Sequence, residues 1–277
     1  MTGTETLFAP TGRISTVRHS VLIRSLAVIV FGVCLIGGCS VTTSDSQAAP
    51  SQIQVFAAAS LSQVFDDMGK QFHAQHPEIT IVTNFAGSQT LVDQIFHGAQ
   101  ADVLATADSR TMDRALSEGL VTDPQIFATN TLVLITPKDN PAGIRGFDST
   151  LTGTALVVCA PAVPCGATTQ AIASDLGISL HPVSEEQSVT DVANKVVSGQ
   201  ADAGVVYATD ARQLGDEVKS FPIPRALNHP NTYPIARTVH SQPGTSSTAD
   251  AAQEFIDFVL SPQGRAILRD HGFELQD

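Results

Sequence analysis

Residues 52–72, QIQVFAAASLSQVFDDMGKQF, change from a strand pattern to a helix pattern at Ser60. The run 52–58 predicts a short strand, whereas apolar residues after Ser60 recur at the spacing of one helix face. These apolar residues are Leu61, Val64, Phe65, Met68 and Phe72. A serine at the first position of a periodic run is a common helix start. The stretch therefore predicts a strand followed directly by an amphipathic helix.

The same alternation continues along the chain. Further strands are predicted at 79–85, 103–104, 132–136, 156–160 and 204–207, and helices at 90–97, about 110–118, about 168–176, 192–197, about 249–260 and 264–270. Strands and helices in alternation favour an α/β fold with mostly parallel sheets. Ligands of such sheets bind beyond the carboxyl ends of the strands, where helices begin.

The first 38 residues have the pattern of a secretory signal. Arg13, Arg18 and Arg24 precede an apolar run at 26–38, which Cys39 follows directly. That run is shorter than the roughly 20 apolar residues that span a bilayer, so a cleaved signal is favoured over a membrane helix. The sequence IGGC at the cleavage point resembles the bacterial lipobox, which implies that Cys39 becomes the acylated first residue.

Residues 39–51 are small and polar and predict a flexible tether. We therefore expect an extracytoplasmic protein that the lipid on Cys39 anchors to the cell membrane, with no other membrane contact. The remainder of the 277 residues is long enough for two domains with separate cores.

Charge and cysteine content narrow the function further. The net charge is −12 with 15 Lys plus Arg, and no basic stretch interleaved with aromatics follows the signal, so nucleic-acid binding is excluded. Cys159 and Cys165 are the two cysteines of the mature body. In an oxidising compartment they predict a disulfide, with a pair of buried free thiols as the alternative.

Four turns have the composition of an anion site: residues 56–61, 85–90, 163–167 and 188–191. Each opens a predicted helix. The first N–H groups of a helix lack internal partners and carry the positive end of its dipole, so they can hold an anion without Lys or Arg. A serine at the start of one of these helices could by itself be an ordinary N-cap. Together they predict an uncharged anion site.

The order of these motifs resembles the molybdate-binding proteins of bacterial ABC importers over residues 53–273. The shared motifs are FAAASL at 56–61, FAGSQTL at 85–91, ADV at 101–103, AD at 107–108, VPCG at 163–166, ADAGVVY at 201–207 and the tail from PQG at 262–264 to GF at 272–273. The resemblance implies a two-lobed, type II periplasmic-binding-protein-like fold. Lobe 1 would contain 52–131 and 230–277 and lobe 2 would contain 132–229, with two crossing strands at the hinge.

The resemblance also assigns the ligand contacts. Ser60 and Ser88 would donate from the first lobe, and the backbone N–H groups of Cys165 and Val189 and the Tyr207 hydroxyl would donate from the second. The sequence departs from the family's common pattern at Cys165, where alanine is usual, and at Gly87 and Gln89, where serines are frequent. A bridge from Cys159 to Cys165 would tie the anion loop to the preceding strand.

The implied function is capture of molybdate, and of tungstate, for delivery to an ABC permease by a monomer without cofactor, catalysis or directly coordinated metal. A cage made only of donors cannot satisfy the proton of hydrogen phosphate. Sulfate is smaller and would contact fewer donors at good length. Tungstate should therefore compete with molybdate, and sulfate should not.

Three other interpretations of the sequence are less favoured. One is a receptor for a different small anion or organic acid. A serine or cysteine hydrolase using Ser60 or Cys165 lacks the Gly-x-Ser-x-Gly motif. A metal site at His73 and His76, three residues apart, has no cysteine or acidic pair beside it at ligand spacing, so we interpret these histidines as solvated.

Overall fold

The computed structural model describes residues 51–224, 227–240 and 247–275. The predicted signal, Cys39 and the predicted tether up to residue 50 lie outside the described residues. The described part lies in one compact unit, Gln47–Asp277. In this part, no helix is both long and apolar enough to cross a membrane.

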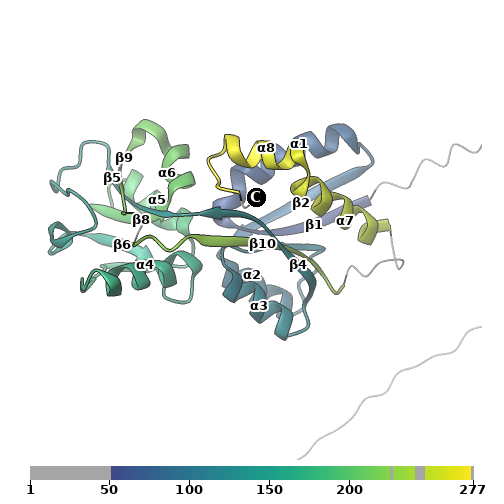
Figure 1. Cartoon of the computed structure of the whole chain (residues 1–277), viewed down its shortest axis with the longest axis horizontal. Coiled ribbons are helices and arrows are strands. Elements are labelled where there is room, and N and C mark those ends of the chain that lie inside the picture. The colour runs from purple at the N-terminus through teal and green to yellow at the C-terminus, as the bar shows by residue number, and fades with distance from the viewer. Residues whose placement is uncertain (1–50, 225–226, 241–246, 276–277) are drawn as a thin grey trace, which may run out of the picture. The chain divides into compact units, whose positions relative to one another are not determined.

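The first sheet has the strand order β2-β1-β3-β10-β4. Its strands are β1 (Ser51–Ala58), β2 (Ile79–Ala86), β3 (Val103–Ala105), β4 (Val121–Asn130) and β10 (Asn231–Thr238). The 3-10 turn η1 (Ala59–Leu61) leads into α1 (Ser62–Gln75), and the other helices of this sheet are α2 (Ser88–Phe96), α3 (Ser109–Ser117), α7 (Ser247–Leu260) and α8 (Pro262–Asp270). Figure 1 shows α1 and α8 on one side of the sheet and α2 and α3 on the other.

The second sheet has the order β7-β6-β8-β5-β9. Its strands are β5 (Leu132–Pro137), β6 (Leu156–Cys159), β7 (Ser184–Glu186), β8 (Ala203–Tyr207) and β9 (Val218–Pro222). Helices α4 (Pro164–Asp175), α5 (Val189–Val197) and α6 (Ala208–Leu214) and the short turns η2 (Ser149–Leu151) and η3 (Gly215–Glu217) accompany it.

Two passages of the chain join the sheets. The chain leaves the first sheet after Asn130, enters β5 at Leu132, and returns between Pro222 and Asn231. In the first sheet β10 runs antiparallel to its neighbours β3 and β4, and in the second β5 runs antiparallel to β8 and β9. The other pairings are parallel. All strands of the first sheet except β10, and all strands of the second except β5, therefore run in one direction, which confirms the predicted α/β class with mostly parallel sheets.

Some element bounds differ from the prediction. β1 begins at Ser51, a residue that we had expected in the tether. Helix α4 begins at Pro164 and not near 168, because proline is favourable in the first turn, where its missing N–H is not needed. The sequence pattern did not predict β4, β7, β9 or α6. In β4, Pro124 and the positive φ of Asp123 interrupt the alternation on which strand prediction depends.

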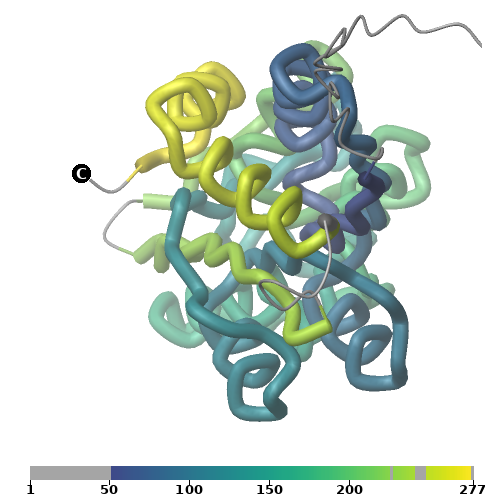
Figure 2. The backbone as a smooth tube through the Cα atoms, turned by 90° about the vertical axis from the view of Figure 1, so that its right-hand side faces the viewer, coloured from purple at the N-terminus to yellow at the C-terminus, as the bar shows by residue number. Residues whose placement is uncertain are grey.

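The core of the first sheet is built around aromatic rings that link α7 to α1. The ring of Phe255 on α7 lies 5.8 Å from that of Phe65 and 5.4 Å from that of Phe72, both edge-on. All three side chains are buried. Figure 2 shows α7 lying across the sheet near α1 and α8. The C-terminal helices thus complete a core that begins with the first helix of the chain.

We expect Phe255→Ala to lower the free energy of unfolding by about 3–5 kcal/mol, because it leaves a cavity among packed rings. Phe96→Ala is the matched control, since Phe96 is 56% exposed and its loss should change stability by no more than about 0.5 kcal/mol. Denaturant unfolding of residues 47–277 measures both. Equal losses would contradict this account of the core.

Candidate functional site

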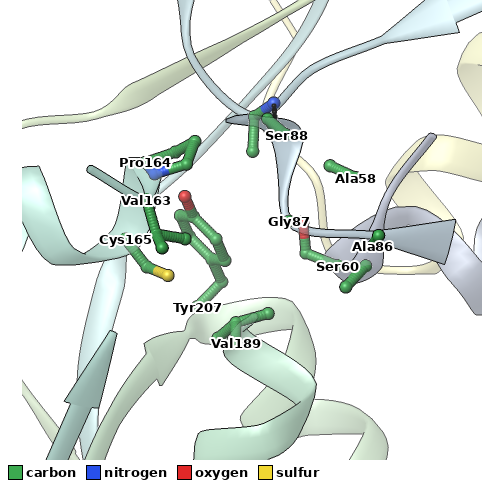
Figure 3. Close-up of a pocket in the computed structure, with 12 residues that line it drawn as sticks. Ala58, Ser60, Ala86, Gly87, Ser88, Val163, Pro164, Cys165, Val189 and Tyr207 are labelled. Atoms are coloured by element: carbon green, nitrogen blue, oxygen red, sulfur yellow. Dashed lines mark hydrogen bonds between the residues drawn. The ribbon is translucent and has the colours of Figure 1, made fainter. Parts of the chain in front are cut away.

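A cavity lies where helix starts from both sheets meet (Figure 3). Its volume is about 210 Å³ including its open mouth. The residues that line it are Ala58, Ala59, Ser60, Ala86, Gly87, Ser88, Ala107, Val163, Pro164, Cys165, Val189 and Tyr207. The structure thus brings together all five residues of the predicted ligand set.

The first sheet contributes two buried serines. Ser60 follows β1 within η1, and its Oγ lies 3.0 Å from the hydroxyl oxygen of Tyr233. Ser88 opens α2, and its Oγ accepts a hydrogen bond of 3.0 Å from the backbone N–H of Ala107. Because the Ser88 oxygen already accepts, its hydroxyl hydrogen is free to be donated elsewhere.

The second sheet contributes two helix starts. Cys165 follows Pro164 in the first turn of α4, and Val189 is the first residue of α5. Backbone N–H groups at these positions have no acceptor within their helices. Ser188, the N-cap of α5, is occupied locally, because its Oγ accepts from the backbone N–H of Asp191 at 3.2 Å. The free donors of this helix start are therefore backbone groups.

The start of α4 is held in place by covalent and steric contacts. Cys159 at the end of β6 and Cys165 form a disulfide with a Cα–Cα distance of 5.8 Å. At Gly166 an added Cβ would lie 2.0 Å from the carbonyl oxygen of Ala160, so only glycine allows this close approach. Both contacts hold the turn at residues 163–167 close to the end of strand β6.

Tyr207 places an unpartnered hydroxyl at the cavity. The residue ends β8 and is the N-cap of α6, and Figure 3 shows its side chain between Cys165 and the Ser60–Gly87 side. The side chain is 1% exposed, and its hydroxyl makes no hydrogen bond of good geometry within the described residues, although the Tyr233 hydroxyl lies near enough to influence its pKa. Burial raises the pKa of Tyr207, so the hydroxyl stays protonated and can donate. A buried hydroxyl without a partner costs about 1–3 kcal/mol, which favours an acceptor at this point.

The cavity is uncharged. No lysine, arginine, histidine or carboxylate is among the described residues that line it. Below Tyr207, the Asp210 side chain is buried and accepts from the backbone N–H of Tyr207 at 3.0 Å. Burial raises the pKa of Asp210 to about 7, although this hydrogen bond lowers it. Near neutral pH this carboxyl therefore carries less negative charge than an exposed aspartate does.

Three contacts that the sequence did not predict cross the rim between the two sheets. An added Cβ on Gly87 would lie 2.1 Å from the carbonyl oxygen of Gln187, so the backbones meet there. The Gln89 Nε2 donates to the same carbonyl at 3.1 Å, and Arg110 Nη2 donates to the carbonyl of Ala162 at 3.0 Å. Only the fold joins residues so far apart in sequence, so no local pattern could have revealed these contacts.

Asn231, which the sequence did not predict as part of the site, connects the contributions of the two sheets through hydrogen bonds. Its Nδ2 donates to the carbonyl of Ala107 at 3.0 Å, and its Oδ1 accepts from the Thr168 hydroxyl at 2.8 Å. Ala107 is the residue that donates to Ser88, and Thr168 lies on α4. This buried amide thus links the serine side of the cavity to the cysteine side.

Sequence comparison gives one family and several close relatives. The model of the family described as bacterial extracellular solute-binding protein matches residues 53–274. The chain is 44% identical to the molybdate-binding protein ModA of Mycobacterium tuberculosis over 256 residues, which cover 89% of this chain and 94% of the relative. It is 29% identical to the molybdate-binding protein ModA of Escherichia coli, covering 84% of this chain and 92% of that one.

Solved structures share the fold. The periplasmic molybdate-binding protein of Azotobacter vinelandii superposes with a TM-score of 0.70 at 20% identity, covering 81% of this chain and 100% of that one. The sulfate-binding protein SubI of Mycobacterium tuberculosis superposes with a TM-score of 0.66 at 20% identity, covering 82% of this chain and 88% of that one. Because one fold carries both kinds of binding protein, the residues of the cavity must decide the ligand.

The raised pKa of Asp210 predicts how stability depends on pH. A carboxyl whose pKa is higher in the folded than in the unfolded chain makes the free energy of unfolding fall as the pH rises between the two values. For Asp210 this window runs from about 3.8 to about 7. The slope from this group approaches about 1.4 kcal/mol per pH unit.

We expect the free energy of unfolding of Asp210→Asn to fall less as the pH rises through this window. The amide does not titrate, and its oxygen can still accept the hydrogen bond from the backbone N–H of Tyr207. Asp216→Asn, at an exposed aspartate in η3, is the control. Denaturant unfolding between pH 4 and pH 8 gives the free energy of unfolding at each pH. If this free energy depends on pH in the same way in the Asp210 variant and the unchanged protein, Asp210 does not titrate in this window.

Proposed function

Because this chain belongs to the bacterial extracellular solute-binding protein family, we propose that it binds molybdate, and tungstate, in the cavity between its two sheets for import by an ABC permease. The 44% identical relative is a molybdate-binding protein. The ligand set is Ser60, Ser88, Cys165, Val189 and Tyr207. It holds molybdenum as an oxyanion, so no protein atom coordinates the metal itself and no cofactor takes part.

The unpartnered Tyr207 hydroxyl is the observation that carries this proposal. A buried donor aimed into an uncharged cavity requires an acceptor, and an oxyanion offers acceptors in several directions at once. The serine hydroxyls and the first-turn N–H groups of α4 and α5 supply further donors from other directions. Hydrogen bonds to a charged group are about twice as strong as neutral ones, so neutral donors suffice.

The absence of an acceptor at the cavity explains selectivity. Within the described part of the chain, no carboxylate lines the cavity, so nothing there accepts the proton of hydrogen phosphate. A protonated anion would place its O–H against a protein donor and leave both unsatisfied. Fully ionised tetrahedral anions avoid this penalty. Tungstate and molybdate have nearly the same size, whereas sulfate is smaller and reaches fewer donors at good length.

The two sheets act as two lobes, residues 52–131 with 230–277 and residues 132–229. Donors from both lobes contact the same anion, so binding stabilises the closed arrangement of the lobes. The closed form is what the permease recognises. The protein works as a monomer outside the cytoplasm, with the lipid on Cys39 as its attachment to the membrane.

A hydrolase is not favoured by the site chemistry. Cys165 is held in a disulfide and therefore has no thiolate to attack with. Ser60 contacts the Tyr233 hydroxyl, and no histidine is among the described residues that line the cavity. A nucleophilic serine needs an adjacent general base. The chain's relatives are solute-binding proteins.

We expect Ser60→Ala and Ser88→Ala each to weaken molybdate binding by about 1–3 kcal/mol, the loss of a hydrogen bond to a charged group. Calorimetric titration of residues 47–277 with molybdate measures the change. Ser117→Ala, an exposed serine on α3, is the control. Unfolding in the absence of ligand separates a binding loss from a folding loss, because both cavity serines also have protein partners. Unchanged affinity in both cavity variants would contradict the assigned site.

A second prediction concerns closure of the lobes. We expect Gly87→Ala to weaken molybdate binding by more than about tenfold, because the added Cβ would meet the Gln187 carbonyl oxygen at 2.1 Å and keep the lobes apart. Gly69→Ala is the control, since its Cβ would meet Ile81 at an ordinary 3.9 Å. Calorimetric titration reports both. Full affinity in the Gly87 variant would show that binding does not need this close approach.

A further inference from the structure

A second cluster of ligating side chains lies on the first sheet's helical face. His76 caps the C-terminus of α1, Glu78 follows two residues later, and Glu254 lies on α7. The His76 Nδ1 lies 3.2 Å from a carboxylate oxygen of Glu254 and 3.6 Å from one of Glu78. One ligand atom from each residue lies within 4.8 Å of the other two. None of these residues lines the oxyanion cavity.

The local structure fixes the direction of the imidazole nitrogen. The His76 ring stacks on Phe72, with ring centroids 4.5 Å apart and planes 17° from parallel. Its backbone N–H donates to the Phe72 carbonyl at 2.9 Å, and its carbonyl accepts from Ile79 at 3.0 Å. Phe72 is fully buried. The imidazole is therefore anchored to the core on one side, while Nδ1 faces the carboxylates.

One carboxylate is equally well anchored through its backbone. The carbonyl of Glu78 accepts from the N–H of Ser51 at the start of β1 at 2.9 Å. The other carboxylate stands on α7, which packs on α1 through Phe255. Half-exposed carboxylates on fixed backbones can move by the small distance that a shared ion requires. The three ligands thus come from two segments that the core holds together.

In the described part of the chain, the two carboxylates of this cluster lack a permanently charged cationic partner. Within residues 51–224, 227–240 and 247–275, neither Glu78 nor Glu254 forms an ion pair with a lysine or arginine. Two carboxylates therefore meet one imidazole at the C-terminus of α1, where the helix dipole adds further negative potential. A divalent cation would satisfy all three groups at once.

We propose that His76, Glu78 and Glu254 bind a divalent transition-metal ion of the zinc class, separate from the oxyanion. An imidazole nitrogen with two carboxylate oxygens suits Zn²⁺, whereas Mg²⁺ and Ca²⁺ prefer sites made of oxygen alone. Three protein ligands leave a further coordination position for water. The bound ion joins the end of α1 to α7 and stabilises the docking of α7 on α1.

The local sequence does not reveal this cluster. The sequence suggests His73 as the partner of His76, but the Nδ1 of His73 forms a hydrogen bond with the carbonyl of Ile79 at 3.0 Å. No acidic pair lies beside these histidines at ligand spacing in the sequence. Glu254 is far away in sequence, and only the packing of α7 on α1 brings it to His76.

The test is calorimetric titration of untagged residues 47–277 with ZnCl₂. We expect one ion per chain, with affinity reduced by at least about tenfold in Glu254→Gln and in Glu78→Gln. Both substitutions keep the size of exposed side chains, so the fold should be retained. Zn²⁺ should also raise the unfolding midpoint of the unchanged protein and not that of Glu254→Gln.

The control is Asp175→Asn, because His229 and Asp175 form a pair 2.7 Å apart with a single carboxylate. This variant should bind Zn²⁺ like the unchanged protein. Titration with MgCl₂ should show no binding at the same concentrations. No Zn²⁺ binding, or binding unaffected by both glutamate substitutions, would overturn the proposal. Molybdate affinity is measured on the same variants and should not change, so the outcome is independent of the oxyanion site.

Discussion

A buried anion must find a hydrogen-bond donor on every side, and this requirement explains the arrangement of the structure around the cavity. The proposed donors are hydroxyls and helix-start N–H groups, so strands of both sheets have to end at the same place. Two of these groups are held by contacts on the side away from the cavity. Ser88 is held by Ala107, and the start of α4 by the disulfide to Cys159. The Tyr207 hydroxyl is the donor whose protein partner is missing within the described residues.

The same requirement explains why neutral groups are used in a chain of net charge −12. A lysine or arginine at the cavity would attract every anion, protonated or not. Donors without charge separate anions by whether each oxygen can accept. The buried carboxyl of Asp210 fits this arrangement, because burial raises its pKa and so reduces its negative charge near neutral pH. On the proposed function, selectivity would depend on hydrogen-bond direction more than on Coulomb attraction.

The turns of this site could be predicted from local sequence, since a helix start needs only a strand, a small polar residue and a periodic apolar run, whereas the choice of single ligand residues rests on the family resemblance. Ser60, Ser88 and Val189 all occupy such starts. What could not be predicted depends on pairs far apart in the chain. Gln187 meets Gly87 and Asn231 joins Ala107 to α4. Glu254 lies beside His76 because α7 packs on α1 within the first sheet's half of the chain. Strand β4 was missed because Pro124 and the turn at Asp123 break its alternation.

An uncharged donor cage of this kind should select tetrahedral oxyanions that are both fully ionised and as large as molybdate. The most direct test of this selectivity is thermal unfolding of residues 47–277 with molybdate, tungstate, sulfate, phosphate or no addition. A ligand at a hundred times its dissociation constant stabilises by about 2.7 kcal/mol, which raises the midpoint by about 5–10 °C for this size. We predict that rise with molybdate and tungstate, and none with sulfate or phosphate. An equal rise with sulfate or phosphate, or no rise with molybdate, would contradict this selectivity.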